Sequence, residues 1–477
     1  MTSQLTFHGG AGTVTGANFL LEFNSIREKS RNDARSENAS VGEAFSSGAG
    51  SKILIDCGIH EREEMCDLAN YGAFPYDPKT IAALFITHAH ADHIGRVPKL
   101  VRDGFKGVIY GTPATKELSA VMFEDALNVM RQDRGKQNCG VLYEEADVSR
   151  ALSLWQTHEY HEPFLIEGAQ AEFLDAGHIL GSAMVKLTRD KRRIIFTGDL
   201  GNSPEPLLND TESPEGANYL VMESVYGDRV HEERGERLER LKQAIQETRE
   251  RKGVLLIPSF SLERTQILLF EIYKMAETGA LPPIPVYLDS PLAIRITEVF
   301  RRYKTLMNST AQEYFAKGND PFDFPGLTLT EDMDASNRIH KSPNPKIIIA
   351  GAGMSHGGRI RRHEKRYLGD NHTTLLFAGY QAPGSLGRRI QEGEKRVEID
   401  GEHITVRARI ETVTGYSGHK DRDGLLEFAN SAGDTLEKVF VTMGEPKSSL
   451  FLAQRLRDFL NIEAIVPDAE QSFKLNW

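Results

Sequence analysis

The segment THAHADH, from Thr87 to His93, constrains this chain more than any other feature of its sequence. Four side chains that can bind a metal ion occur in it within six residues: His88, His90, Asp92 and His93. In an extended turn, residues two apart project to the same side, so His88 and His90 can hold one ion. Asp92 and His93 lie further along and can reach a second. Imidazole and carboxylate ligands suit Zn²⁺, Mn²⁺ and Fe²⁺, and a pair of ions roughly 3.5–4 Å apart can clamp both oxygens of a displacement reaction.

Short apolar runs rich in β-forming residues supply further candidate ligands at their ends. The runs KILID, ALFIT, AEFLDAGH, RRIIFTGD, YLVME and RIETVTGYSGH lead to Asp56, His88, His178, Asp199, Glu223 and His419, respectively. Strands are also expected at residues 4–8 and 18–23, and helices at 94–103, 113–130 and 236–251. Strands that alternate with helices indicate an α/β fold. Because function gathers in the loops at strand ends, the pattern predicts one site along one edge of a sheet.

Composition narrows the class of protein. A length of 477 residues suggests two or three domains. The 57 Lys and Arg against 68 Asp and Glu give a net charge of −11, so binding to RNA or DNA would need a local basic patch. Three cysteines without metal-type spacing favour a reducing cytoplasm over a disulfide scaffold. Neither a signal peptide nor an apolar stretch of about 18 residues is visible, so no membrane partner is expected.

The sequence predicts two loops and one inserted segment that interrupts a domain. Residues 24–51 are polar and rich in Ser, Ala and Gly, which predicts a long mobile loop. Residues 317–325 are rich in Pro, Gly and Asp and read as a loop as well. The stretch from about 227 to 417 carries strand–helix units of its own, and we expect it to interrupt the domain that holds the metal motif.

The ordered set of candidate ligands resembles the successive motifs of the metallo-β-lactamase superfamily. Further segments resemble its β-CASP branch, which includes the cleavage-and-polyadenylation endonuclease and ribonuclease J. These segments are MESVYGDR (222–229), LLIPSFSLERTQ (255–266), YLDSPLA (287–293), AGAGMSHGGRI (350–360), GYQAPGSLGRRI (379–390) and GYSGHKD (415–421). The likeness covers nearly the whole chain except residues 24–51.

This resemblance implies an α/β fold, namely a four-layer αββα metallo-β-lactamase sandwich interrupted by an α/β β-CASP domain. Residues 1–227 would form the first part of the sandwich domain. Residues 228–417 would form the β-CASP domain, and residues 418–477 would return to the sandwich.

The resemblance also implies two Zn²⁺ sites, with Mn²⁺ as an alternative ion. One site would use His88, His90, His178 and Asp199, and the second would use Asp92, His93 and the shared Asp199. Asp92 would also serve catalysis, and Asp56 would orient an imidazole or the attacking hydroxide. Glu223 and His419 match family motifs beyond the metal set, in which a Glu-oriented His could protonate the leaving oxygen or bind the scissile phosphate.

The sequence departs from the family pattern at Met443. The third β-CASP motif usually carries a metal-binding His in a Val-His-Gly-Glu context, whereas this chain reads VFVTMGEP. A thioether is a poor ligand for Zn²⁺ or Mn²⁺, so the second metal is expected to be weakly bound. Smaller departures occur at Val225, Glu263, Ile267 and Ser355.

Two basic clusters offset the acidic total. They are GRIRRHEKR and LGRRIQEGEKR, and their arginines could follow a phosphate backbone. The residues expected to bind substrate are Arg359, Arg361, Arg362, Arg388, Arg389 and His419.

Three functions are compatible with these features. The leading hypothesis is a metal-dependent nuclease that hydrolyses phosphodiester bonds of single-stranded RNA through a metal-bound hydroxide. RNA is preferred over DNA by analogy only, because DNA-processing members carry Val where this chain has Met443. The first alternative is a catalytically weak RNA-binding β-CASP subunit of a processing complex. The second is a hydrolase of small esters or lactams, which the long insertion disfavours. A homodimer and a cytoplasmic location fit all three.

Overall fold

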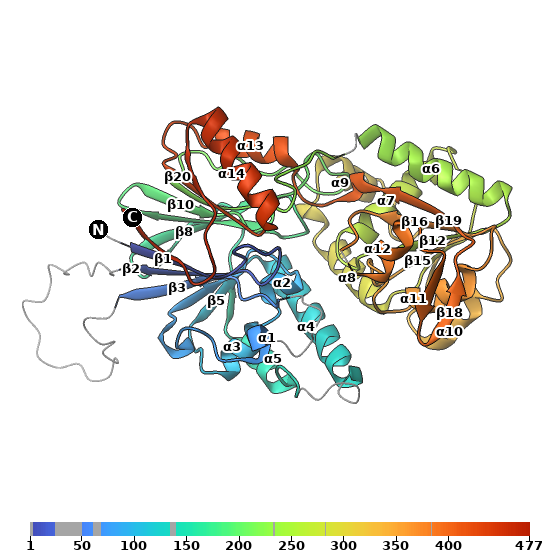
Figure 1. Cartoon of the computed structure of the whole chain (residues 1–477), viewed down its shortest axis with the longest axis horizontal. Coiled ribbons are helices and arrows are strands. Elements are labelled where there is room, and N and C mark those ends of the chain that lie inside the picture. Colours follow the sequence, from blue (N-terminus) through green and yellow to red (C-terminus); the bar gives the residue numbers. More distant parts are fainter. Residues whose placement is uncertain are drawn as a thin grey trace, which may run out of the picture.

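Figure 1 shows the computed structural model of the whole chain. The structure describes residues 3–23, 50–60, 68–133, 140–231, 234–281, 283–382 and 384–477. The loop expected over residues 24–51 lies outside the described residues up to position 49, and Ser51 already begins a strand.

Two seven-stranded sheets form the larger part of the molecule. In spatial order, the first contains β22 (Ser472–Leu475), β1 (Ser3–Gly9), β2 (Asn18–Phe23), β3 (Ser51–Ile55), β4 (Ala83–Phe85), β5 (Val108–Gly111) and β6 (Trp155–Thr157). The second contains β21 (Glu463–Ile465), β20 (Lys438–Thr442), β11 (Tyr219–Glu223), β10 (Arg192–Phe196), β9 (Ala183–Arg189), β8 (Ala169–Asp175) and β7 (Phe164–Ile166). The last strands of the chain therefore complete both sheets.

The two sheets pack face to face through aromatic side chains. The ring of Phe7 on the first sheet lies 5.4 Å from that of Phe440 on the second, and Phe19 lies 6.4 Å from Phe196. All four belong to one buried apolar cluster. Truncating such a ring to Ala costs about 3–5 kcal/mol, so this layer fixes the sandwich and with it the strand ends.

Helices cover the outer faces of both sheets (Figure 1). On the first sheet these are α1 (Leu68–Tyr71), α2 (Ala91–Ile94), α3 (Val97–Arg102), α4 (Pro113–Asp133) and α5 (Glu145–Ser153). On the second they are α13 (Arg422–Asn430) and α14 (Pro446–Leu460). The order helices, sheet, sheet, helices confirms the expected four-layer arrangement.

A third sheet belongs to the expected interruption. Its order is β14 (Leu327–Leu329), β13 (Val286–Leu288), β15 (Lys346–Ala350), β12 (Val254–Pro258), β16 (Thr374–Ala378) and β19 (Arg409–Val413), and β17 (Arg396–Ile399) pairs with β18 (Glu402–Thr405) in a separate hairpin. Its helices are α6 (Arg234–Glu250), α7 (Arg264–Glu277), α8 (Pro291–Arg302), α9 (Ser309–Ala316), α10 (Met333–Ile339), α11 (Ile360–Tyr367) and α12 (Leu386–Gln391). β12, β15 and β16 are buried at every position, as parallel strands covered on both faces require.

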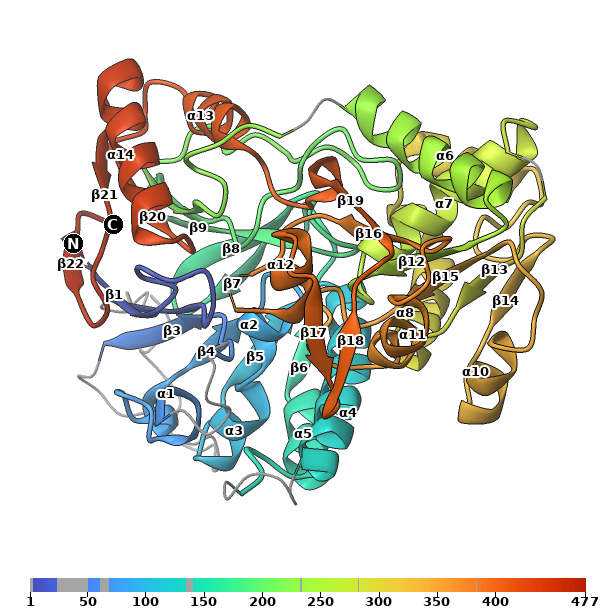
Figure 2. The ribbon, with the colours of Figure 1, turned by 45° about the vertical axis from the view of Figure 1, so that its right-hand side comes forward.

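The third sheet, the β17–β18 hairpin and helices α6–α12 together form what we call the third-sheet unit. This unit lies beside the sandwich (Figure 2). Helix α8 packs against α4, and Arg295 on α8 pairs with Glu124 on α4 at 2.5 Å. The named strands of the third sheet run from 254 to 413 in the chain, between β11 and β20. We therefore propose the limits 1–227, 228–417 and 418–477 for the two parts of the sandwich domain and the unit between them.

Most of the elements expected from the sequence occur, but one helix is divided. Residues 94–103 form the end of α2 and then α3, which begins at Val97. Pro98 lacks a backbone N–H and is tolerated only in the first turn of a helix, so a new helix has to begin just before it. Residues 317–325 form the expected loop between α9 and β14. Within the described part of the chain, none of the helices is long and apolar enough to cross a bilayer.

Candidate active site

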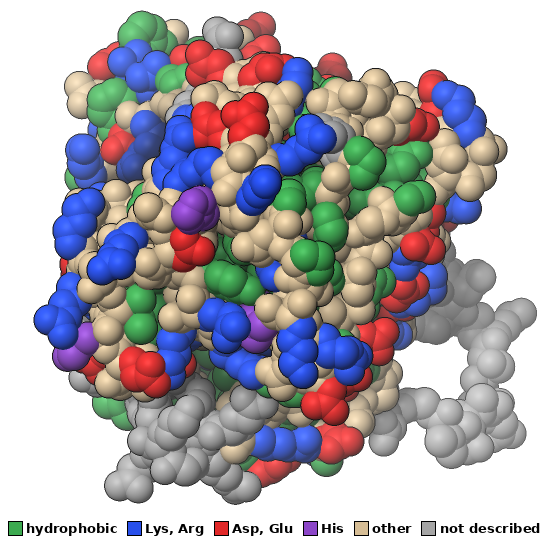
Figure 3. All heavy atoms as spheres, turned by 90° about the vertical axis from the view of Figure 1, so that its right-hand side faces the viewer, with side chains coloured by type: hydrophobic (Ala, Val, Ile, Leu, Met, Phe, Trp, Pro, Cys, Tyr) green, Lys and Arg blue, Asp and Glu red, His purple; other side chains and the backbone are tan. Residues whose placement is uncertain are grey.

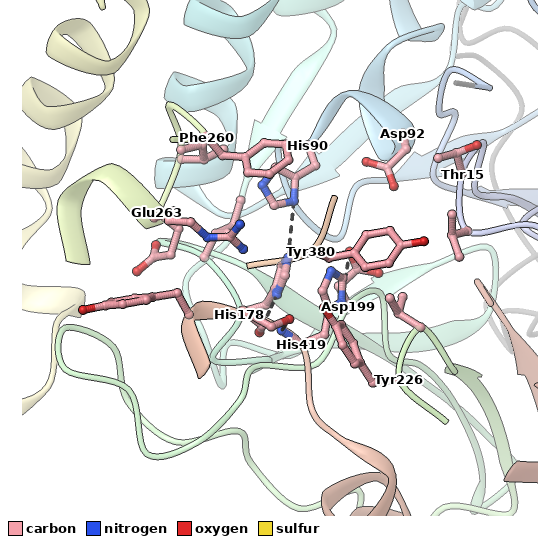
Figure 4. Close-up of a pocket in the computed structure, with 18 of the residues that line it drawn as sticks. Thr15, His90, Asp92, His178, Asp199, Tyr226, Phe260, Glu263, Tyr380 and His419 are labelled. Carbon is pink, nitrogen blue, oxygen red and sulfur yellow. Dashed lines mark hydrogen bonds and ion pairs between the residues drawn. The ribbon is translucent and has the colours of Figure 1, made fainter. Parts of the chain in front are cut away.

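The metal motif lies in a cavity of about 390 Å³ between the sandwich and the third-sheet unit. His90, Asp92, His178, Asp199 and His419 all line it. Figure 4 shows these side chains converging from separate loops. The strand ends explain the convergence, since β4, β8 and β10 each end a few residues before one of these groups. The sequence predicted one site along one edge of a single sheet, whereas β4 belongs to the first sheet and β8 and β10 to the second, so the candidate ligands come from the ends of strands in both sheets.

Four candidate ligands of the first metal come together. Nε2 of His88 lies 3.1 Å from Nδ1 of His90 and 3.4 Å from Oδ2 of Asp199. Nε2 of His178 lies 3.3 Å from the same nitrogen of His90 and 3.6 Å from the same oxygen of Asp199. Ligands at roughly 2.0–2.1 Å around a tetrahedral ion are separated by roughly 3.3 Å, so these four atoms have the spacing of a tetrahedral metal site.

A second group shares Asp199 with the first. Nε2 of His93 lies 3.4 Å from Oδ1 of Asp199 and 3.7 Å from Oδ2 of Asp92. Nε2 of His93 and Oδ1 of Asp199 are both buried, and neither has a hydrogen-bond partner among the described residues. Buried polar atoms without partners are costly, so this pair points to a cation between them. The residues present thus fit divalent metal, and Asp199 belongs to both of these groups and to a third with Glu223 and His419.

Asp56 is fully buried behind this second group. Its Oδ1 accepts a hydrogen bond from the backbone N–H of Thr87 at 2.9 Å. Its Oδ2 accepts from the Thr87 hydroxyl and from Nδ1–H of His93, both at 2.8 Å. The bond to Nδ1 leaves Nε2 of His93 free to bind metal. Nδ1–H of His178 donates in the same way to the carbonyl of Gly418 at 3.0 Å.

The electrostatics of the site favour bound cations. Burial, together with neighbouring histidines, lowers the pKa of His90 and His178 well below the usual value, so both stay neutral and able to bind metal. Burial also acts to lower the pKa of His93, but the charges of Asp199, Asp92 and Asp56 outweigh it and raise that pKa well above its usual value. That concentration of negative charge is what metal ions would balance.

Glu223 and His419 form a pair at the edge of the metal group. Nδ1–H of His419 donates to Oε1 of Glu223 at 3.2 Å, and the backbone N–H of Leu200 donates to the same oxygen at 2.6 Å. Nδ1 of His419 lies 4.0 Å from Oδ2 of Asp199. Burial lowers the pKa of His419, but Glu223 and Asp199 raise it to about 9 overall. The pair therefore presents a protonated imidazole to the pocket at neutral pH.

The five arginines expected to bind substrate do not line the pocket. The side chain of Arg359 is 14% exposed, and its guanidinium donates to the buried carboxylate of Asp289 at 2.7 Å. This ion pair holds the chain after β13 to the start of α11. The other arginines pair with neighbours on their own unit: Arg361 with Asp400, Arg362 with Asn337, Arg388 with Glu392 and Arg389 with Glu394.

Basic and acidic side chains intermingle on the face that the third-sheet unit presents in Figure 3. An arginine held beside a carboxylate attracts phosphate less than a free one does. Arg359 is thus held by Asp289, and none of the five arginines is among the residues that line the pocket, so their contact with substrate stays a prediction.

The pocket instead contains two arginines that the sequence did not single out, Arg229 and Arg264. Arg229 follows β11, and Arg264 follows β12 and begins α7. Arg264 lies over the ring of Phe260 at 5.0 Å, and its Nε has no hydrogen-bond partner among the described residues. Gly379 makes room for it, because a Cβ there would lie 2.6 Å from the guanidinium. The strand-end rule that found the ligands would also have found both arginines.

Comparison with known proteins gives matches along most of the chain. The family model described as the Metallo-beta-lactamase superfamily matches residues 35–245. The Beta-Casp domain matches residues 265–390, and the Zn-dependent metallo-hydrolase RNA specificity domain matches residues 403–467.

Several curated proteins are similar over most of this chain. Ribonuclease TTHA0252 of Thermus thermophilus is 35% identical over 407 residues, which cover 85% of this chain and 91% of that protein. The RNase J-like protein of Methanocaldococcus jannaschii is 31% identical over 87% of this chain and 92% of its own length. Transcription termination factor FttA of Methanosarcina mazei is 30% identical over 87% of this chain, which spans only 66% of that protein.

One solved structure shares the fold at low sequence identity. It is a protein of unknown function from Enterococcus faecalis V583, with a TM-score of 0.57, 12% identity and complete coverage of both chains.

Proposed function

The chain belongs to the metallo-β-lactamase superfamily, in its Beta-Casp branch, and on this basis we propose that it hydrolyses phosphodiester bonds of single-stranded RNA. The observation that carries the proposal is the carboxylate of Asp199, which three groups of candidate metal ligands share at the wall of the pocket. The match to an RNA specificity domain and the ribonuclease among the relatives support RNA as the substrate.

We propose Zn²⁺ for both positions, because imidazole and carboxylate ligands at tetrahedral spacing suit it. The first ion would be held by His88, His90, His178 and Asp199, and the second by Asp92, His93 and Asp199. Divalent cations bound there would polarise the phosphate and lower the pKa of an attacking water.

Side chains of the protein itself would orient the metal ligands and donate a proton to the leaving oxygen. Asp56 fixes the ring of His93 so that Nε2 faces the site. Glu223 holds Nδ1 of His419 and leaves the other ring nitrogen free to reach the oxygen of the leaving nucleotide. A protonated His419 can then give up a proton as the bond to phosphorus breaks.

The test is incubation of end-labelled RNA and DNA of the same sequence with the purified protein, with and without a chelator. We expect cleavage of RNA that stops with chelator and returns with added Zn²⁺ or Mn²⁺. Preferential cleavage of DNA would overturn the choice of substrate, and cleavage that survives removal of the metal would overturn the mechanism.

Arg264 should bind a phosphate of RNA in this pocket, and Arg229 should contribute less, because its Nε–H donates to the carboxylate of Asp228 at 2.8 Å. We expect Arg229→Ala and Arg264→Gln together to weaken RNA binding and to reduce the slope of log affinity against log salt by roughly 0.7 for each phosphate that is no longer neutralised. The measurement is RNA binding between low and moderate salt. The matched comparison is Arg361→Ala with Arg362→Ala, whose guanidinium groups pair with Asp400 and Asn337. A larger change in that comparison variant would show that RNA binds along the outer arginines instead.

Met443 favours the second candidate function, a catalytically weak RNA-binding subunit. Its side chain is 2% exposed and belongs to the apolar cluster between the sheets. A Cβ at Gly10 would lie 2.6 Å from its sulfur, so the thioether packs against Gly10. The second metal group therefore contains three residues, Asp92, His93 and Asp199, and we propose that this metal binds weakly.

Met443→His should raise the metal content of the purified protein from between one and two ions toward two. The backbone of Met443 has a φ of 45°, and His is among the residue types enriched at positive φ, so the change should fit. The measurement is elemental analysis after dialysis, with activity followed across a metal titration. Met443→Leu is the control, because it keeps an apolar side chain and adds no ligand. Two tightly bound ions in the unaltered protein would contradict the prediction.

A further inference from the structure

Glu263 is the most strained residue in the wall of the pocket. It precedes α7 with φ 69° and ψ −59°, a backbone conformation that residues other than glycine rarely adopt. It is nevertheless a large acidic residue, and it is only 5% exposed. Strained backbone at a site persists where the surrounding structure enforces it and often has a role in binding.

Of the two carboxyl oxygens of Glu263, one has a hydrogen-bond partner among the described residues and the other has none. Its Oε2 accepts a hydrogen bond from the backbone N–H of Leu180 at 3.2 Å. Its Oε1 is buried and has no hydrogen-bond partner in the described part of the chain. Burial, with the charge of Glu205 nearby, raises the pKa of this carboxyl well above its usual value, so the group favours its neutral form until a hydrogen-bond donor on a ligand stabilises the carboxylate. A buried acceptor at the wall of a pocket is suited to a donor on a ligand.

The position of Glu263 in the pocket indicates which part of the substrate it would contact. Leu180, which holds its Oε2, follows the candidate ligand His178 by two residues, and Glu263 and His178 line the same pocket. Figure 4 shows Glu263 near Phe260 and His178, on the side of the pocket opposite Thr15 and Asp92. A nucleotide whose phosphate reaches the metal group would direct its base or ribose toward this wall.

The surroundings favour a nucleobase. Phe260, Leu262, Ile267 and Met354 line the same pocket and give it apolar and aromatic surface. Unpaired bases in RNA sites stack on such surfaces and are read by hydrogen bonds to their edges. A phosphate offers acceptors only, and Oε1 cannot pair with it while it acts as an acceptor.

We propose, on the basis of the RNA hydrolysis proposed above, that Glu263 determines base specificity. Its Oε1 accepts a hydrogen bond from the exocyclic amino group of the base next to the scissile phosphate. Cytosine, adenine and guanine carry such a group, and uracil does not. The enzyme should therefore cut poorly where uracil occupies this position.

The test compares RNAs that differ at one nucleotide. After the cleavage site in one RNA has been mapped, the nucleotide on each side of it is made cytosine or uracil in turn. We expect the unaltered protein to favour cytosine at one of the two positions by about tenfold in kcat/KM. Glu263→Gly removes the carboxyl and suits the positive φ, so it should fold and cut both RNAs at similar rates.

Two further variants sharpen the result. Glu263→Gln can keep an oxygen toward the N–H of Leu180 and turn its amide N–H toward the base, so it should reverse the preference toward uracil. Asn461→Gly relieves a φ of 53° at the end of α14, far along the chain from the pocket, and should leave the preference unchanged. Thermal unfolding of each variant establishes that it is folded.

Three results would overturn the inference. Glu263→Gly that keeps the cytosine preference would reduce Glu263 to a structural role. An equal loss of cleavage of the cytosine and uracil RNAs by Glu263→Gly would show that Glu263 does not recognise the base. An effect that follows a 2′-deoxy substitution, and not the base, would assign Oε1 to the ribose. If the unaltered protein cuts no RNA at all, the proposed function fails first, and the inference fails with it.

Discussion

Replacing His90 by alanine should reduce hydrolysis of RNA by more than about a hundredfold while the fold survives. Nδ1 of His90 lies 3.1 Å from Nε2 of His88 and 3.3 Å from Nε2 of His178, so it completes the group around the first metal. Its loss leaves three ligands and should reduce both metal content and turnover. The fold should survive because His90 lines the open pocket and is not part of the apolar clusters. The measurements are metal content, circular dichroism and single-turnover cleavage of labelled RNA.

His372→Ala is the matched control for this change. His372 lies on the third-sheet unit with its side chain 60% exposed and contacts Asp370. The control removes the same ring from a surface position, so metal content and activity should stay as in the unaltered protein. Cleavage by a His90→Ala preparation from which a chelator has removed all metal would contradict the metal mechanism.

The grouping of the candidate ligands was predictable from the sequence because these residues obey a local rule. Each of His88, His178 and Asp199 lies within a few residues of the end of a strand whose apolar run is visible in the sequence. These strands belong to both sheets of the sandwich, so strand ends in the sequence predicted which side chains gather in loops, and the packing of the two sheets brings those loops together. The alternation of strands and helices predicted an α/β fold, and the four-layer arrangement was implied by the resemblance to a family.

Side chains whose partners lie far along the chain were not predictable in this way. The ion pair of Arg359 with Asp289 joins residues 70 positions apart, and no sequence pattern around either residue predicts it. The basic cluster therefore resembled a phosphate-binding surface until its partners were known. Met443 is similar, because its packing against Gly10 depends on β1 lying beside the turn after β20.

Glu263 shows a second limit of prediction from the sequence. Its position in LLIPSFSLERTQ identified it as a departure, but its significance depends on a backbone angle and on one unsatisfied oxygen. Neither quantity has a signature in composition or periodicity. Such features become visible only when the pocket is assembled from loops of both units.

Replacing His419 by alanine should lower the rate of RNA cleavage by about 10²–10⁴-fold with little change in metal content. His419 holds its Nδ1–H on Glu223 at 3.2 Å. It forms a third group of candidate ligands with Glu223 and Asp199, but it is not among the residues proposed to hold either ion, so its loss should remove a proton donor and leave the metals bound. A general acid matters less when the leaving group is already stable as an anion. The loss should therefore shrink on a phosphodiester with a nitrophenolate leaving group, whereas a pure phosphate-binding role would give equal losses on both substrates. Glu223→Gln should show the same pattern more weakly, since it disturbs the orientation of the ring and keeps the ring itself.

The dependence of activity on pH gives a second measure of the role of His419. The pKa of His419 is raised to about 9 in the metal-free chain, and bound cations would lower it. Because the acid has to be protonated, activity of the unaltered enzyme should fall as pH rises through that pKa, at or below about pH 9, and this alkaline limb should be absent from His419→Ala. An unchanged alkaline limb in the variant would assign proton transfer to another group.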